Sequence, residues 1–347
     1  MRTTAIGLPR LTIVKRLVLA AFLIVVGFVG WTGVQIWSSW NSVDKIPYNP
    51  AGTRAALPSI PEPAPGDTVP PFAVSPPVDD ATFDSFLVVG SGFQGRLADV
   101  IMLFLLPDDG GQPSIVSLPR DLYLPSPCAG EMMRINANYN GCGDTASGPQ
   151  LLALAVADFT GIEVDHFALF DFEGFDEIID DVGGVTICVD NPVRDADAWL
   201  SLPAGCTEAS GAQALGWVRT RKTQELVNGS WRAVPGQSDL TRHQHQQDVI
   251  FQLFDRLQDF SSLGDLTNKV DSLSDTFTVD ADLTMGSAIS LAWSLRGFDQ
   301  SDFKRLTIPV ESFTTAAGAA VLKPTATFSS VLQEAYPELR IAGGPLS

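Results

Sequence analysis

The sequence predicts an α/β (α+β) protein, a three-layer sandwich in which helices flank a central mixed sheet, with one transmembrane helix ahead of it. Closely spaced apolar runs typical of buried strands, followed by segments with helical apolar spacing, predict the sandwich. A long uncharged run near the N-terminus predicts the membrane helix. With 45% hydrophobic residues in 347, the chain can bury a sizeable core.

Residues 17–34, LVLAAFLIVVGFVGWTGV, are uncharged and nearly long enough to span a bilayer core as a helix. Tryptophans follow at the position of interfacial anchors, and four cations precede the run: Arg2, Arg10, Lys15 and Arg16. The positive-inside rule then predicts a cytoplasmic tail at 1–16, a transmembrane helix at 17–40 in the cell membrane, and an extracytoplasmic remainder. The alternative is a cleaved signal peptide, but the run exceeds the usual h-region and no small-x-small cleavage site follows it.

Residues 41–80 are rich in proline, as in PSIPEPAPGDTVPPFAVSPP. This composition predicts a semi-rigid, extended spacer without a core of its own. The spacer would hold one folded domain, expected at 81–337 and followed by a tail at 338–347, away from the bilayer.

The folded domain opens with three stretches that are too apolar to have a solvated face: SFLVVG (85–90), DVIMLFLL (99–106) and SIVSL (114–118). They predict neighbouring buried strands. GPQLLALAVADFTG (148–161) has helical spacing and a glycine stop, and a strand at HFALF and a helix at FEGFDEIIDDVGG follow it.

The four cysteines, Cys128, Cys142, Cys188 and Cys206, all fall on the side of the membrane where disulfides persist. Three connectivities are open. Pairing of nearest neighbours is preferred, because each such pair brackets one loop-rich segment. The lack of C-x-x-C spacing and the presence of only three histidines argue against a structural zinc site.

Positive charge gathers in WVRTRK (217–222), although the formal net charge of the chain is −18. So acidic a chain, without a segregated basic domain, is not expected to bind nucleic acid. Alternation in GWVRTR favours a strand that projects Arg219 and Arg221 from one face, with Trp217 in the same row. Two guanidinium groups so placed favour a phosphate between them, and a solvated strand edge is the alternative.

A helix is predicted from SDLTRHQHQQDVIFQLFDRL, with Asp239 as its N-cap. Continued towards the N-terminus, its apolar stripe reaches Gln246 and Arg242, so these polar side chains face inward near a helix end that favours anions. A solvent-directed Arg242 is the alternative. The stripe consists of Val249, Ile250, Leu253, Phe254 and Leu257.

Six motifs, in this order, resemble the LytR-CpsA-Psr family of cell-envelope proteins: IVSLPRDLYL, RINANY, FTGIEVDHFALFDFEGF, VGGVTICV, LPAGCTEASGAQALGWVRTR and DLTRHQHQQ. The resemblance covers residues 83–257 clearly and extends weakly to 337. It implies a membrane-anchored extracytoplasmic transferase that moves a glycopolymer from a polyprenyl-pyrophosphate carrier to peptidoglycan or a related cell-wall acceptor.

The resemblance also implies roles for individual residues. Asp99 would hold Mg²⁺ (or Mn²⁺), and Asp99, Arg120, Arg219 and Arg221 would be catalytic. The residues that would bind the pyrophosphate are Arg120, Arg134, Arg219, Arg221, Arg242 and Gln246. Arginine, with its bidentate fork, suits the neutralisation that attack on a pyrophosphate requires.

Two residues depart from the family pattern. Gly92, in GSG, stands where the family has an aspartate, and His245 stands where a second helix cation is expected, so that charge would depend on pH. Asp84, Asp121 and Asp171 are candidate substitutes for the missing acid. These departures motivate an alternative function, a catalytically weakened module that binds lipid pyrophosphate or polymer.

Overall fold

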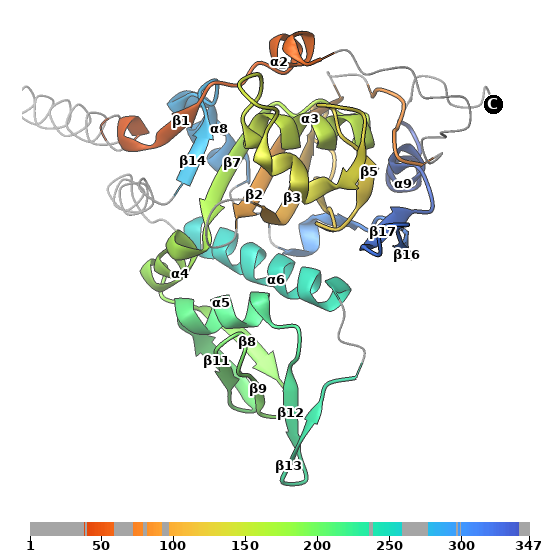
Figure 1. Cartoon of the computed structure of the whole chain (residues 1–347). Coiled ribbons are helices and arrows are strands. Elements are labelled where there is room, and N and C mark those ends of the chain that lie inside the picture. Colours follow the sequence, from red (N-terminus) through yellow and green to blue (C-terminus); the bar gives the residue numbers. More distant parts are fainter. Residues whose placement is uncertain are drawn as a thin grey trace, which may run out of the picture.

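The computed structural model describes residues 38, 40–58, 72–78, 82–91, 97–235, 239–258, 277–295, 298 and 300–339 (Figure 1). At its centre is a seven-stranded sheet with the order β1-β14-β7-β2-β3-β4-β15. Both parallel and antiparallel neighbours occur in it, so the predicted mixed sheet is confirmed. Its strands are β1 (Asp44–Ile46), β2 (Phe83–Ser91), β3 (Ala98–Pro107), β4 (Ser114–Ser117), β7 (His166–Asp171), β14 (Phe277–Asp280) and β15 (Lys304–Leu306).

The central strands bury both faces of the sheet and so divide the interior into two cores. Along β3, Ile101 and Leu103 enter one core, while Val100 and Met102 enter the other, because successive side chains of a strand point to opposite faces. Helices α3 (Gly148–Thr160) and α9 (Phe328–Ala335) pack in the first core. The second core holds α4 (Phe172–Asp181), α5 (Gly211–Arg219) and α6 (Asp239–Gln258).

Local signals explain the predicted helix α3. A capping box begins it, in which the Gln150 side chain accepts a hydrogen bond from the Ser147 N–H at 2.8 Å. Gly161 ends it in the left-handed conformation, at φ 74°. The strand and helix predicted after it are β7 and α4.

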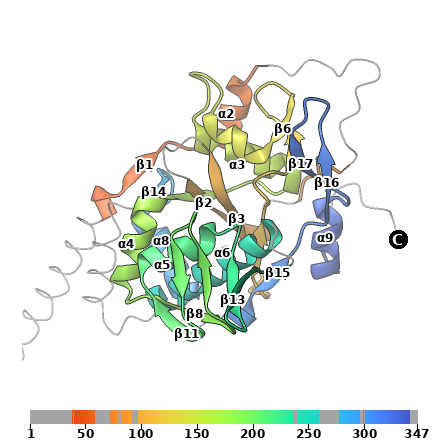
Figure 2. The same ribbon diagram turned by 60° about the horizontal axis from the view of Figure 1, so that its bottom comes forward.

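Below the central sheet lies a second group of strands, here called the lower lobe and comprising the strands within residues 185–209 and 224–233. Figure 1 shows α5 and α6 between the central sheet and this lobe, and Figure 2 brings the lobe forward. It contains the pair β8 (Val185–Val189) and β11 (Gly205–Ala209). Its four-stranded sheet has the order β10 (Leu200–Leu202), β9 (Val193–Asp195), β12 (Gln224–Val227) and β13 (Ser230–Ala233).

Shorter elements complete the described part of the chain. They are α2 (Pro50–Ala56), β5 (Tyr123–Pro125), β6 (Met132–Arg134), η2 (Ile135–Asn140), α8 (Met285–Leu295), η3 (Gln300–Asp302), β16 (Val310–Thr314) and β17 (Ala320–Pro324).

Both predicted disulfides are present. Cys128 is bonded to Cys142, and Cys188 to Cys206. The second bond joins β8 to β11, where the two cysteines are direct cross-strand partners. The preference for nearest neighbours is therefore confirmed.

The strand predicted for GWVRTR is wrong, because these residues belong to helix α5 and its C-terminal end. A capping box begins the helix: Ser210 Oγ accepts from Gln213 N–H at 3.4 Å, and Gln213 Oε1 accepts from Ser210 N–H at 3.0 Å. Arg219 is the last helical residue, and Arg221 follows the buried Thr220. Arg219 and Arg221 thus do not share a strand face.

The predicted spacer at 41–80 also needs correction. Residues 44–46 form edge strand β1, which pairs in parallel with β14. Tyr48 is buried, with its ring centroid 5.1 Å from that of Phe167, and Ala73 and Val78 are buried too. Apolar side chains between the prolines therefore reach the core, which the composition alone obscures.

No helix among the described residues is long and apolar enough to cross a membrane. Apart from residues 38 and 40, the span predicted at 17–40 lies outside the described residues.

Candidate functional site

The site begins with an ion pair at one end of the central sheet. Asp99 lies at the start of β3, and Arg120 follows the C-terminal end of the neighbouring β4. Arg120 Nη1 donates to Asp99 Oδ1, and the Asp99 side chain remains 29% exposed. The structure thus brings together two of the predicted catalytic residues where solvent can reach them.

A second acid extends this pair into a network. Asp121 lies between two guanidinium groups: its Oδ2 is 3.5 Å from Arg120 Nε, and its Oδ1 is 3.1 Å from Arg134 Nε. Arg134, at the end of β6, also donates to the Ala320 carbonyl at 2.8 Å. Of the three candidate substitute acids, Asp121 is therefore the one whose side chain joins the arginines.

Arg219, at the C-terminal end of α5, is influenced by the charge of Asp99. Burial lowers the pKa of its guanidinium, while the charges of Asp99 and Asp176 oppose that shift. Arg219 therefore lies within electrostatic reach of Asp99, and an arginine stays protonated at neutral pH. Asp176, on α4, was not predicted, because its segment has the pattern of a solvated acidic helix face.

Arg221 has a different environment. Its side chain is exposed, and its backbone N–H donates to Asp195 Oδ2 at 3.2 Å. Among the described residues, no ion pair joins Arg221 to Asp99 or Asp121. The side chains of Arg219 and Arg221 thus lie in different environments.

Asp195 anchors the segment that carries Arg221. Its Oδ2 also accepts from Thr220 Oγ1 at 2.6 Å and from Lys222 N–H at 3.0 Å. Burial opposes ionisation of Asp195, but these hydrogen bonds outweigh it and lower the pKa of the carboxyl. A single buried carboxylate thus fixes the backbone immediately after α5.

Helix α6 contributes the predicted Gln246. Its side chain is buried, and Nε2 donates to the Val218 carbonyl at 3.4 Å. The neighbouring His245 ring stacks on Trp217, with centroids 3.9 Å apart. Burial lowers the pKa of His245, against the effects of a hydrogen bond with the Trp217 backbone and the charge of Asp248. Arg242 lies on α6, but its side chain falls outside the described residues.

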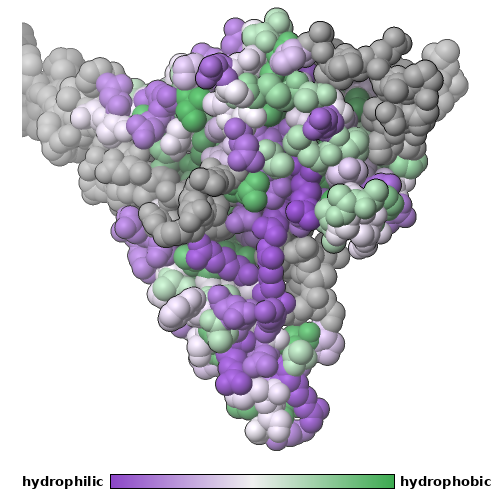
Figure 3. All heavy atoms as spheres, in the orientation of Figure 1, coloured by the Kyte–Doolittle hydropathy of each residue, from purple (hydrophilic) through white to green (hydrophobic). Residues whose placement is uncertain are grey.

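A small apolar void lies behind these charges, between the central sheet and helices α4, α5 and α6. It is lined by Val100, Phe170, Phe175, Val218, Gln246 and Ile250. Val100 follows Asp99 in the chain, and Val218 precedes Arg219. Figure 3 shows hydrophilic residues running down the middle of the molecule towards the lower lobe. The site therefore combines a charged opening with an apolar interior.

The predicted metal position has a sparse donor set. Among the described residues, no group of three His, Cys, Asp or Glu side chains is placed to hold a metal. Asp99 offers a hard oxygen donor, one atom of which already accepts from Arg120. This fits a Mg²⁺ that takes most of its ligands from substrate phosphate and water.

The remaining acids differ in position. Asp84 pairs in register with Leu106 at the far end of β2 and β3, so it does not substitute for the acid missing at Gly92. The Asp171 backbone pairs with Ser91 at the near end, but its side chain lies outside the described residues, as does Gly92.

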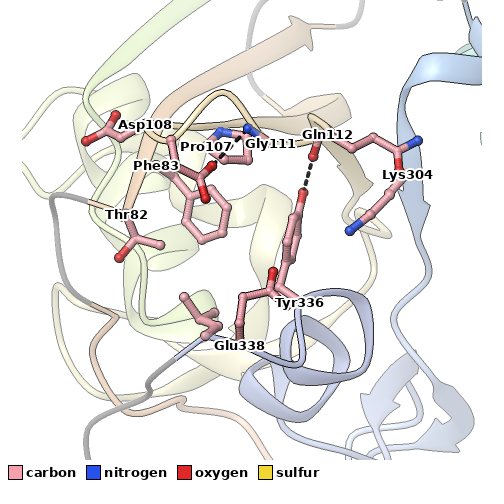
Figure 4. A pocket seen from close by; sticks show the side chains of 11 residues that line it. Thr82, Phe83, Pro107, Asp108, Gly111, Gln112, Lys304, Tyr336 and Glu338 are labelled. Atoms are coloured by element: carbon pink, nitrogen blue, oxygen red, sulfur yellow. Dashed lines mark hydrogen bonds between the residues drawn. The ribbon is translucent and has the colours of Figure 1, made fainter.

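A cavity of about 460 Å³ lies at the far end of the sheet (Figure 4). Phe83 and Tyr336 line it together with three acids, Asp108, Asp109 and Glu338. Tyr336 Oη donates to the Gln112 carbonyl at 2.8 Å. Its lining contains no arginine, so its chemistry does not suit a pyrophosphate.

Comparison with known proteins identifies the family of the chain. Residues 79–335 match the model of the LytR_cpsA_psr family. The chain is 34% identical over 221 residues to a probable cell wall biosynthesis protein, LcpB, of Corynebacterium glutamicum, covering 62% of this chain and 47% of LcpB. It is 29% identical over 193 residues to the polyisoprenyl-teichoic acid–peptidoglycan teichoic acid transferase TagU of Oceanobacillus iheyensis, covering 55% and 56%.

The fold is also similar to that of solved structures. A LytR-Csp2A-Psr enzyme from Actinomyces oris superposes with a TM-score of 0.61 and 24% identity, covering 76% of this chain and 93% of that one. The chain spans about half the length of the curated relatives it matches.

Proposed function

The chain belongs to the LytR_cpsA_psr family, and on that premise we propose that it is a membrane-anchored extracytoplasmic phosphotransferase. It moves a glycopolymer from a polyprenyl-pyrophosphate carrier to peptidoglycan or a related cell-wall acceptor. The observation that carries the proposal is the network of Arg120, Arg134 and Arg219 around Asp99 and Asp121, set against an apolar void. The similarity to TagU, a polyisoprenyl-teichoic acid–peptidoglycan teichoic acid transferase, supports it.

The network suits recognition of a pyrophosphate. Arg120, Arg134 and Arg219 present planar donors that bind phosphate oxygens in pairs. Ion pairs of Arg120 with Asp99 and of Arg134 with Asp121 hold these two guanidinium groups in place before substrate arrives.

The reaction exchanges the phosphoanhydride bond of the pyrophosphate for a phosphodiester bond to the acceptor. An acceptor hydroxyl attacks the phosphorus that bears the glycan, forming an O–P bond and releasing its proton to water. The bridging P–O bond breaks, and its electron pair leaves with polyprenyl monophosphate. The arginines stabilise the negative charge on both phosphates as attack proceeds. A Mg²⁺ (or Mn²⁺) held by Asp99 would add a Lewis acid that neutralises the same charge.

The test uses the full chain in detergent micelles, with a short-chain polyprenyl-pyrophosphate oligosaccharide, a soluble peptidoglycan strand and Mg²⁺. Mass spectrometry should detect polyprenyl monophosphate and the joined glycan in equal amounts. Arg219→Ala should reduce both products at least about 100-fold. The matched control is Arg256→Ala, which removes an arginine paired with Glu208 at 2.9 Å outside the network. Equal loss in both variants would contradict the proposal.

One observation favours the alternative function, a binding module with weakened catalysis. Burial of His245 against Trp217 lowers the pKa of the histidine, so the helix lacks a cation at neutral pH where the family pattern expects one. A pure binding module would retain the lipid pyrophosphate tightly and release no polyprenyl monophosphate at any Mg²⁺ concentration. The same assay therefore separates the two functions.

A further inference from the structure

Trp199 is held in a position that packing does not explain. It lies in the turn between β9 and β10, its side chain is 92% exposed, and its backbone adopts φ 54°. The left-handed backbone conformation is strained for a bulky residue, and an indole this exposed contributes almost no hydrophobic stabilisation that could offset the strain. Such a combination next to a functional site points to a role in binding.

The turn that carries Trp199 is firmly fixed. Asp195 Oδ1 accepts from Asp197 N–H at 3.0 Å, and Trp199 N–H donates to the Ala196 carbonyl at 3.4 Å. On the helix side, a Cβ added at Gly216 would lie 2.9 Å from the Ala198 carbonyl oxygen, so only glycine permits this approach of α5. The backbone of the turn at Trp199 is therefore held in place.

The same turn adjoins the arginine segment. Asp195, at its start, binds the backbone N–H groups of Arg221 and Lys222 at 3.2 and 3.0 Å. Lys222 also pairs with Asp197 at 2.8 Å. The turn that carries Trp199 and the segment of Arg221 and Lys222 thus lie side by side.

A second tryptophan continues this surface. Trp231, on β13, is 36% exposed, and the Arg194 guanidinium lies 4.1 Å from its ring centroid. Arg194 Nε in turn donates to Gln224 Oε1 at 3.0 Å. Arg194 is the cross-strand partner of Gln224, and Trp231 is the partner of Leu226, two residues further along β12. Because residues two apart on a strand point to the same face, Arg194, Gln224 and Trp231 all lie on the outer face of the four-stranded sheet. Trp199, Arg194, Gln224 and Trp231 are called the tryptophan ledge.

The ledge has the chemistry of a sugar-binding surface. Sugar rings offer C–H faces that pack on indole rings, and hydroxyls that hydrogen-bond to amide and guanidinium groups. Polar Arg194 and Gln224 lie next to Trp231, unlike the apolar centre that a protein interface requires. The charge of Lys222, in the adjoining segment, is matched by Asp197.

We propose that the tryptophan ledge binds uncharged sugar units of the transferred glycopolymer. The polymer runs from the arginine network past Trp199 and across the outer face of β9, β12 and β13. This proposal rests on the proposed function for the identity of the polymer. Continuity with the arginine segment through Asp195 and Arg221 supports a glycan as the occupant.

The test measures binding by the full chain in detergent micelles, using affinity electrophoresis through gels containing galactan, dextran or soluble N-acetylglucosamine oligomers. Variants Trp199→Ala and Trp231→Ala are compared with the control Phe313→Ala. Phe313 is an equally apolar ring, 38% exposed, on β16 in a separate two-stranded sheet. A second arm measures binding of polyprenyl pyrophosphate without sugar.

We expect Trp199→Ala to weaken glycan binding about tenfold and Trp231→Ala about threefold, with Phe313→Ala unchanged. Binding of the sugar-free lipid should stay within about twofold of wild type in all three variants. The proposal is overturned if wild type binds none of the glycans or if Phe313→Ala loses as much as Trp199→Ala. It is also overturned if Trp199→Ala instead changes the sedimentation of the chain, which would make the ledge a self-association surface. Failure of Arg219→Ala to weaken sugar-free lipid binding would count against the proposed function alone.

Discussion

Two carboxylates flank the C-terminal end of α5, and they are used in different ways. Asp99 is 29% exposed and its partner is another side chain, Arg120. Asp195 is 4% exposed and accepts from the Thr220 hydroxyl and from the backbone N–H groups of residues 197, 221 and 222. A ligand anion can replace Asp99 as the partner of an arginine, whereas nothing can replace Asp195 without dismantling the turn.

The difference separates binding chemistry from architecture within one site. Ion pairs between side chains can be exchanged for ligand contacts at small cost, because exposed pairs contribute little stability. Hydrogen bonds from backbone N–H groups to a buried carboxylate are costly to lose, since each donor would remain unsatisfied. Substitutions at the two aspartates should therefore affect different measurements.

The largest effect should come from Asp99→Asn in the transfer reaction. Loss of the carboxylate that would hold Mg²⁺ should lower the rate at least about 100-fold, because the Lewis acid that neutralises charge on the phosphates would no longer be held. The melting temperature should change by no more than about 3 °C, because the pair is partly exposed. Asp158→Asn, which removes a similarly exposed pair with Arg54 at 2.7 Å, is the control and should leave the rate unchanged.

Asp195→Asn should show the reverse pattern. Loss of the charged acceptor should destabilise the fold by about 2–4 kcal/mol, and the transfer rate of the folded protein should stay within about threefold. The pKa of Asp195 is lowered in the fold, so its contribution is present above the ordinary value of about 3.8 and is lost as pH falls through the folded value. Thermal melting as a function of pH should show a shallower acid limb in the variant; an unchanged limb would contradict the assignment.

A smaller effect should distinguish the two arginines. Arg219→Lys should weaken binding of polyprenyl pyrophosphate about tenfold, because lysine cannot supply the planar pair of donors near Asp99. Arg221→Lys should change it less than about threefold, since that side chain is exposed and only its backbone is anchored. Equal losses, which the predicted strand face would have required, would show that both side chains reach the ligand.

Local patterns predicted much of the fold. Strands β2, β3 and β4 and helix α3 follow from apolar runs and caps that lie within a few residues of one another. Helix α5 was missed because Trp217, Arg219 and Arg221 alternate as in a strand. The capping box of Ser210 and Gln213 was the signal that identifies the helix.

The site was predictable in its residue types but not in its connections. Of the residues named from the family resemblance, Asp99, Arg120 and Arg134 are brought together in one network with Asp121, and Gln246 is buried. The roles of Asp176 and Asp195 depend on packing between elements distant in sequence, for which a single chain carries no local pattern. The same holds for β1, whose partner β14 lies more than 200 residues further along.

The smallest expected effect is on the pH dependence of stability and concerns His245. Its ring stacks on Trp217 of α5, the helix whose C-terminal end lies between Asp99 and Asp195. Burial lowers its pKa in the fold, so the unfolded chain binds more protons below about pH 6.5 and stability should fall as pH drops through that range. His166 has the opposite sign: its hydrogen bond with Asp280 raises its pKa, so its contribution is complete below pH 6.5 and is lost as pH rises through the folded value. In wild type the two trends partly cancel.

His245→Phe should keep the stack on Trp217, whose centroid lies 3.9 Å away, while removing the titration. Its melting temperature should therefore decline less than that of wild type between pH 7.5 and 5.5, by an amount equivalent to about 1 kcal/mol or less. His166→Gln, the control, should decline more steeply than wild type over the same range, because it loses the compensating trend. Parallel melting curves for all three proteins would mean that folding shifts neither histidine's pKa, and would contradict both assignments. A steeper decline for His245→Phe than for wild type would mean that His245 is protonated in the fold and supplies the helix cation.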